Sequence, residues 1–155
     1  MFADIDSDMQ VPVYAVISLV LFFLSEPVHE FGHWVTYQLF GIEAEILWMQ
    51  LVTRPVLDTA IANNIWLDNW ILFSSAGGLL AFVVFLPIAW KIHPTVTWVA
   101  WTQLICAVLE PVNTWSTRLG LGEVYCDIAV SAVSVSFGIT IALLITLLRR
   151  FYFET

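Results

Sequence analysis

Apolar residues fall in four long blocks along the chain, with shorter polar segments between them. The blocks cover about residues 11–40, 65–91, 95–112 and 124–150. Each block is long enough, or nearly so, to supply the roughly 20 residues of helix that cross a bilayer core. Their apolar residues are continuous and do not alternate with period two, which favours helices over a membrane β-barrel. The pattern therefore predicts an all-α integral membrane protein with about four transmembrane helices.

The segment between the first two blocks is mixed in polarity. Alternating residues from about Glu43 to Val52 predict a short β-strand or hairpin at the membrane surface, which Arg54 and Pro55 would end. No internal repeat and no soluble module accompany the helices. Residues 1–155 are therefore expected to form a single transmembrane domain.

Composition and charge agree with a membrane environment. The chain is 60% hydrophobic and only 12% charged, whereas about a quarter of a soluble domain is charged. A net charge of −8 with only five Lys and Arg argues against nucleic acid as a partner. We expect the lipid bilayer and other membrane proteins as partners instead. Lys91, Arg149 and Arg150 would lie on one side and Arg54 and Arg118 on the other, so the positive-inside rule predicts that both termini are cytoplasmic.

One motif concentrates the chemistry of the chain. His29-Glu30-Phe31-Gly32-His33 is an HExxH sequence, and it contains two of the three histidines. On a helix, the motif places both imidazoles on one face, with Glu30 beside them to hold and deprotonate a zinc-bound water. In a soluble helix the same residues are often only a solvated face, but a lipid-embedded helix has no such face. The motif therefore predicts one zinc ion held by His29 and His33, with Glu30 as the catalytic base.

Two histidines and a water leave a tetrahedral zinc ion one protein ligand short. Asp127 opens the fourth apolar block, where an unpaired carboxylate at the membrane boundary needs a special reason. We therefore predict Asp127 as the third ligand. Cys126 is the neighbouring alternative, although a cysteine in an apolar segment is often only a small hydrophobe. His93, next to Pro94 in a loop, is expected at the membrane interface.

Two further acids lie in apolar blocks. Glu26 shares a helical face with His29, so it is expected either to orient a histidine or to face water at a bend made by Pro27. Glu110 precedes Pro111 near the end of the third block. We interpret Glu110 as part of a helix terminus in the headgroup region.

Taken together, four features resemble the site-2 protease family of intramembrane zinc metalloproteases. They are HEFGH within an apolar helix, the following GIEAEI stretch, the SSAGGLLAF patch in the next helix, and the late Asp127. The resemblance covers roughly residues 15–140. It implies that His29, His33 and Asp127 hold zinc, and that Glu30 acts as general base and then as proton donor to the leaving amine.

The resemblance also implies roles for residues outside the metal ligands. Asn113 would polarise the substrate carbonyl, and Gly77 and Gly78 would allow the second helix to approach the metal-binding helix closely. The substrate would be a transmembrane helix of another protein. The strand near Glu43 to Val52 would hold its unwound segment by edge pairing.

These expectations favour an intramembrane zinc metalloprotease, a hydrolase that cleaves transmembrane helices of other membrane proteins. The alternative is a non-proteolytic relative, an accessory subunit of a larger membrane complex with a structural or vestigial metal site. The small size of the chain favours that alternative, whereas an intact Glu30 favours the enzyme. An ion or proton conductor that uses the buried acids as a relay is a third hypothesis, but it does not explain the histidine spacing.

Overall fold

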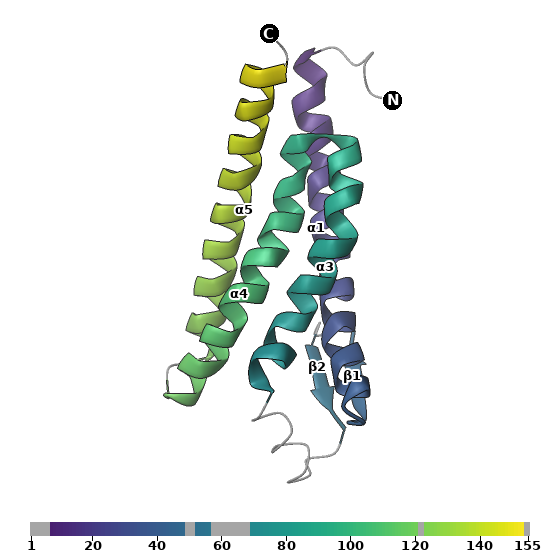
Figure 1. Cartoon of the computed structure of the whole chain (residues 1–155), viewed down its shortest axis with the longest axis vertical. Coiled ribbons are helices and arrows are strands. Elements are labelled where there is room, and N and C mark those ends of the chain that lie inside the picture. Colours follow the sequence, from purple (N-terminus) through teal and green to yellow (C-terminus); the bar gives the residue numbers. More distant parts are fainter. Residues whose placement is uncertain (1–6, 49–51, 57–68, 121–122, 154–155) are drawn as a thin grey trace.

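The chain forms four long helices and one short β-hairpin (Figure 1). The computed structural model describes residues 7–48, 52–56, 69–120 and 123–153, without the side chains of 7–10, 116–118, 123–127 and 153. In that described part, four helices are long and apolar enough to cross a membrane. The prediction of a helical, multi-pass integral membrane protein is therefore confirmed.

The element bounds follow the predicted blocks with two differences. The elements are α1 (Ser7–Leu39), β1 (Ala44–Leu47), β2 (Val52–Pro55), α3 (Trp70–Ile92), the 3-10 helix η1 (Pro94–Thr97), α4 (Trp98–Arg118) and α5 (Glu123–Phe153). Helix α4 continues through Pro111 to Arg118, beyond the predicted end at residue 112. Part of the predicted start of the second block, at residues 65–68, lies outside the described residues.

The hairpin follows α1 directly and packs against it. Strands β1 and β2 are antiparallel, with Glu45 opposite Arg54, and the Arg54 Nε atom lies 3.3 Å from Glu45 Oε1. The hairpin ends where the sequence predicts, because Arg54 and Pro55 are the last two residues of β2. A proline is tolerated there because Pro55 is the last residue of an edge strand. The indole Nε1 of Trp34 on α1 donates to the carbonyl of Ala44 at 3.0 Å, which fixes the hairpin to the helix.

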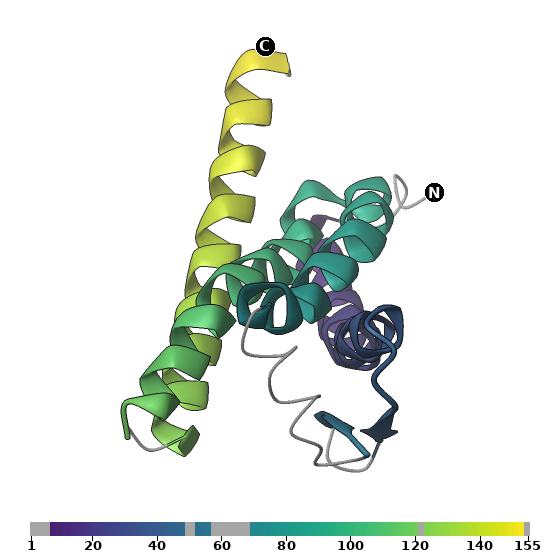
Figure 2. The same ribbon diagram turned by 60° about the horizontal axis from the view of Figure 1, so that its bottom comes forward.

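The helices pack in the order α1, α3, α4, α5, so that α3 and α4 occupy the middle of the bundle. Figure 1 shows the start of α1 and the end of α5 at one end of the bundle and the hairpin at the other. In Figure 2, the C-terminal half of α5 extends away from the other helices. Grooves lined by both α1 and α5 therefore open along the side of the bundle.

Glycines set the close spacing between the helices. A Cβ atom at Gly32 on α1 would lie 2.7 Å from the carbonyl oxygen of Ala76 on α3, so these two backbones are in direct contact. A Cβ atom at Gly78 would lie 2.7 Å from the backbone nitrogen of Ala107 on α4. The expectation that Gly78 faces the metal-binding helix is therefore wrong, because this glycine brings α3 against α4. Close backbone approach at small residues is typical of membrane helices.

We expect Gly78→Ala to destabilise the bundle, because the added methyl group meets backbone atoms of α4 that can only move if the two helices separate. Overpacking of this kind costs about 1–3 kcal/mol. The measurement is the free energy of unfolding in mixed micelles of a native and a denaturing detergent. The neighbouring Leu79→Ala, at a position 44% exposed to the membrane side, is the control and should change it by less than about 0.5 kcal/mol.

Candidate metal centre

The two histidines of the motif lie one turn apart on α1, in the half of the helix nearer the hairpin. Helical geometry places the two side chains at positions i and i+4 on one face. The Nε2 atoms of His29 and His33 are 3.1 Å apart. His29 is buried, with 7% of its surface exposed. The expected pairing of these two imidazoles is present in the structure.

A glutamate from α4 completes the group. Glu110 Oε1 lies 2.8 Å from His29 Nε2, and Glu110 Oε2 lies 3.7 Å from His33 Nε2. One ligand atom from each residue lies within 4.8 Å of the others, so the three side chains could hold a metal ion. The interpretation of Glu110 as a helix terminus is wrong. Because α4 continues to Arg118, this carboxylate lies inside the helix and points into the bundle.

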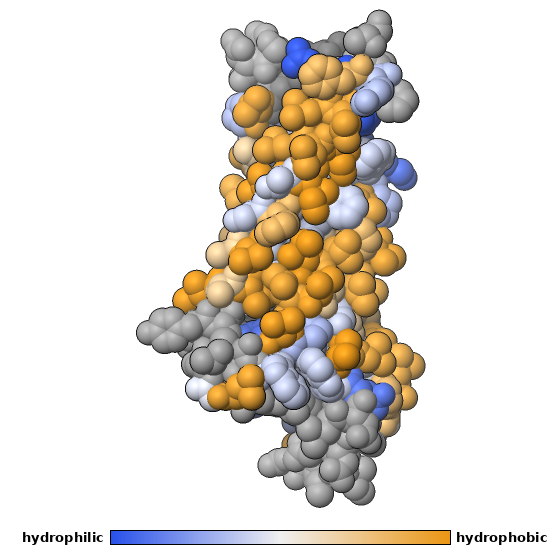
Figure 3. All heavy atoms as spheres, turned by 60° about the vertical axis from the view of Figure 1, so that its left-hand side comes forward, coloured by the Kyte–Doolittle hydropathy of each residue, from blue (hydrophilic) through white to orange (hydrophobic). Residues whose placement is uncertain are grey.

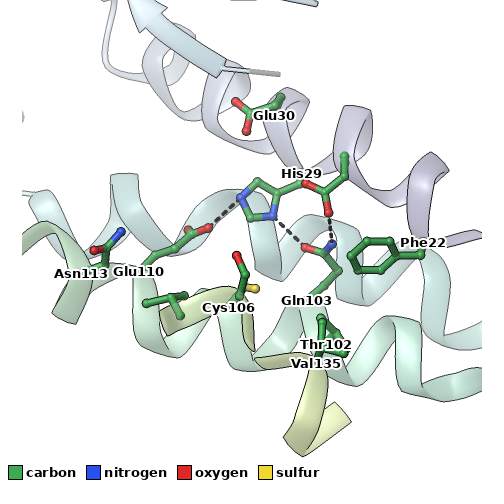
Figure 4. Close-up of a pocket in the computed structure, with 12 residues that line it drawn as sticks. Phe22, His29, Glu30, Thr102, Gln103, Cys106, Glu110, Asn113 and Val135 are labelled. Atoms are coloured by element: carbon green, nitrogen blue, oxygen red, sulfur yellow. Dashed lines mark hydrogen bonds and ion pairs between the residues drawn. The ribbon is translucent and has the colours of Figure 1, made fainter. Parts of the chain in front are cut away.

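Gln103 fixes the tautomer of His29 (Figure 4). A carboxylate only accepts hydrogen bonds, so Gln103 presents its amide nitrogen to Glu26 Oε1 at 3.2 Å and donates with the same nitrogen to Ser25 Oγ at 2.9 Å. Gln103 Oε1 therefore faces His29 Nδ1 at 2.7 Å and accepts its N–H. Figure 4 shows Glu110 on the opposite side of the same imidazole ring.

The backbone of α3 fixes the tautomer of His33 in the same way. The carbonyl oxygen of Phe73 lies 2.7 Å from His33 Nδ1 and can only accept. In both neutral imidazoles the N–H is therefore on Nδ1, which leaves a lone pair on Nε2. Histidine ligands of metal ions commonly donate their other ring N–H to such a partner.

The donor atoms fit a cation at their centre. Two Nε2 lone pairs and a carboxylate oxygen repel one another at these distances unless a proton or a metal ion lies among them. A proton on His29 Nε2 could be shared by Glu110 Oε1 and His33 Nε2, whereas Glu110 Oε2 is buried and has no hydrogen-bond partner in the part of the chain described. Ligands of a tetrahedral zinc ion lie roughly 3.3 Å apart. A metal ion therefore accounts for all the donor atoms.

Gly77 on α3 leaves room for this arrangement. A Cβ atom at this position would lie 2.5 Å from His33 Nε2 and 2.7 Å from His29 Nε2. Any other residue would fill the space beside the converging ligand atoms. The expectation that Gly77 lets α3 approach the metal-binding helix agrees with this contact.

Glu30 lines two cavities, one of which includes His29 and the other His33. One cavity, of about 300 Å³, is lined by α1, α4 and α5. The other, of about 360 Å³, includes Val52 and Thr53 of the hairpin. Glu30, Glu110 and Asn113 line both. The hydroxyl of Thr53 donates to the backbone carbonyl of Glu30 at 2.9 Å, so β2 is attached to α1 at the residue expected to act as base.

The remaining predicted residues fall in different places. The side chains of Asp127 and Cys126 lie outside the described residues, so their roles as third ligand or its alternative stay predictions. Glu26 reaches His29 through Gln103, which agrees with an orienting role. His93 lies at the far end of α3, where its Nδ1 accepts from the Thr95 N–H at 3.3 Å.

Sequence reasoning missed Gln103 and misinterpreted Glu110. A signal for both was present, because Gln103, Cys106, Glu110 and Asn113 follow one another at intervals of three or four residues. That spacing places them on one face of a helix. A polar stripe along an apolar helix indicates a buried polar site.

Comparison with protein-family models, curated proteins and solved structures gives no match. The resemblance to site-2 proteases therefore rests on the sequence motifs alone, and it stays a prediction.

We expect Gln103→Leu to weaken metal binding about 10–100-fold, the usual effect of removing a partner that orients a ligand. Leucine keeps the volume but cannot accept the His29 N–H, so the imidazole loses its fixed tautomer. The measurement is the zinc dissociation constant of the purified protein in detergent. Gln38→Leu is the matched control, because among the described residues Gln38 donates to the carbonyl of Ile42 alone, at 3.5 Å. Equal affinities for both variants would exclude a role of Gln103 in orienting the ligand.

Proposed function

We propose that the protein is an intramembrane zinc metalloprotease that hydrolyses peptide bonds in transmembrane helices of other membrane proteins. The observation that carries the proposal is the convergence of two imidazole Nε2 atoms and the Glu110 carboxylate, with Glu30 lining the cavities that include them. In this proposal Glu110, and not Asp127, is the third zinc ligand.

The choice of zinc follows from the ligands. Two imidazoles and one carboxylate are a common ligand set of catalytic zinc, which keeps its fourth position open. Zinc supplies Lewis acidity, which makes a water molecule acidic enough to attack near neutral pH and polarises the scissile carbonyl. The packing of the helices and the Nδ1 hydrogen bonds would hold the donor atoms in place for the ion.

Glu30 is the proposed base. It is next to His29 in the chain and lines the two cavities that include the candidate ligands. Glu30 would take the proton from the attacking water as the water oxygen bonds to the peptide carbon. It would then give that proton to the leaving amine as the peptide C–N bond breaks. Only 9% of the Glu30 surface is exposed, which limits competing proton exchange with bulk water.

The hairpin provides a place for the substrate. A helical substrate must unwind locally, because its peptide groups are otherwise satisfied within the helix. Val52 and Thr53 of β2 line the cavity that contains Glu30 and His33, so an extended segment paired along the β2 edge would pass the centre. Asn113 lines the same cavity one turn after Glu110 and is the proposed contact to the scissile carbonyl.

The accessory-subunit alternative and the protease differ in the number of protein ligands expected at the zinc ion. A structural zinc site is closed by four protein ligands, whereas a catalytic site keeps a position for water or substrate. Three candidate ligands converge among the described residues, and a carboxylate that could serve as base lies beside them. This arrangement favours the enzyme.

We expect Glu30→Gln to abolish cleavage and to retain zinc, because the amide can neither accept nor return the proton while the three ligands stay in place. The assay incubates purified protein in detergent with a panel of single-span model substrates and detects new termini by mass spectrometry. Zinc content is measured on the same samples.

Thr140→Val is the control, because Thr140 is exposed on α5 and its hydroxyl donates only within that helix, to the backbone carbonyl of Ser136 among the described residues. This variant should cleave like the unmodified protein. Cleavage that survives in Glu30→Gln would remove Glu30 from the mechanism, and a zinc-loaded protein that cleaves no member of the panel would favour the accessory subunit.

A further inference from the structure

The end of the bundle opposite the hairpin has a basic pocket. It has a volume of about 360 Å³ and lies between the end of α3, η1 and α5. Lys91 and Arg149 line it, together with His93 and Thr146. The chain has only five Lys and Arg in all. Two of these five therefore face one small pocket.

Neither cation is neutralised in the part of the chain that the structure describes. The ion pairs found there join His29 and His33 to Glu110 and Arg54 to Glu45. Arg149 instead lies over the indole of Trp90, with its guanidinium carbon 5.8 Å from the ring centroid. Within the described residues Lys91 and Arg149 thus have no acidic partner, and two such cations beside Trp90 attract an anion at the level of the lipid headgroups.

An apolar groove begins where the basic pocket ends. The groove has a volume of about 700 Å³, and His93 lines both it and the pocket. Its walls are mainly α1 and α5. The residues along it are predominantly apolar and include Val11, Ala15, Leu19, Ile139, Ala142 and Leu143.

The groove and the pocket share one face of α5. Ile139, Ala142 and Leu143 line the groove, and Thr146 and Arg149 continue the same face into the pocket at helical spacing. From Arg149 to Ile139 the helix descends about 15 Å toward the bilayer centre. Figure 3 shows hydrophobic side chains over most of the length of this side of the bundle, with hydrophilic ones mainly toward its ends.

We propose that this groove and pocket form a binding site for an anionic phospholipid. The phosphate would lie between Lys91 and Arg149, and one acyl chain would follow the groove between α1 and α5. The charge of the pocket selects an anionic headgroup, and the depth of the groove accommodates a chain that free phosphate lacks. The site is separate from the metal centre and does not depend on the proposed protease activity.

Native mass spectrometry of the delipidated full chain in detergent tests the proposal. Phosphatidylglycerol and phosphatidylcholine with the same acyl chains are added in turn. Phosphatidylglycerol should bind more tightly than phosphatidylcholine by about 25-fold, which is fivefold for each of two cations. Equal binding of the two lipids overturns the proposal.

Paired variants locate the headgroup. Arg149→Ala should weaken phosphatidylglycerol binding about fivefold. Arg150→Ala removes the same charge from the neighbouring residue, which does not line the pocket, and should have little effect. Equal losses of phosphatidylglycerol affinity in the two variants would indicate that the lipid is attracted unspecifically to the end of α5. That result would contradict the proposed site.

A second pair locates the acyl chain. Ala15→Trp fills the groove at an exposed position, whereas Val16→Trp adds the same ring at a neighbouring position that is 61% exposed and outside the groove. Only Ala15→Trp should reduce lipid binding. If glycerol phosphate, which has no acyl chain, displaces the lipid at equal concentration, the groove contributes nothing and the proposal is wrong.

Discussion

Two imidazole nitrogens and a carboxylate face one another inside an apolar helical bundle, and the rest of the structure is organised around that convergence. An ionisable side chain at membrane depth costs roughly 2.5–3.5 kcal/mol on insertion scales. The Nε2 atoms of His29 and His33 are also only 3.1 Å apart, so a proton or a metal ion must lie between their lone pairs. A metal ion bound at that point would satisfy all three ligands and offset the cost of burying them.

The surrounding hydrogen bonds extend this constraint to three helices. Gln103 on α4 and the Phe73 carbonyl on α3 each accept an Nδ1–H, so α1 is linked to both neighbours through its histidines. Those contacts require helix backbones that lie unusually close together. Gly32 and Gly77 permit this spacing between α1 and α3, and Gly78 permits it between α3 and α4. The packing of the bundle and the geometry of the centre therefore depend on the same few small residues.

Much of this fold was predictable from the sequence because its strongest signals are local. Long apolar blocks predict helices, and alternation after Glu43 predicts the hairpin, whatever the helices pack against. The pairing of His29 with His33 also follows from one turn of one helix. Glu110 was harder to assign because its role depends on which helix face turns inward, and Pro111 suggested that the helix ended there. Pro111 lies instead within α4, which continues to Arg118.

Sequence and structure thus favour different carboxylates as the third ligand, Asp127 and Glu110. The most direct measurement is the zinc affinity of Glu110→Gln beside that of Asp127→Asn, both in the purified full chain. If Glu110 binds the ion, Glu110→Gln should lose more than the 10–100-fold typical of an outer partner, while Asp127→Asn stays near the unmodified protein. A large loss in Asp127→Asn with unchanged affinity in Glu110→Gln would contradict the proposed centre.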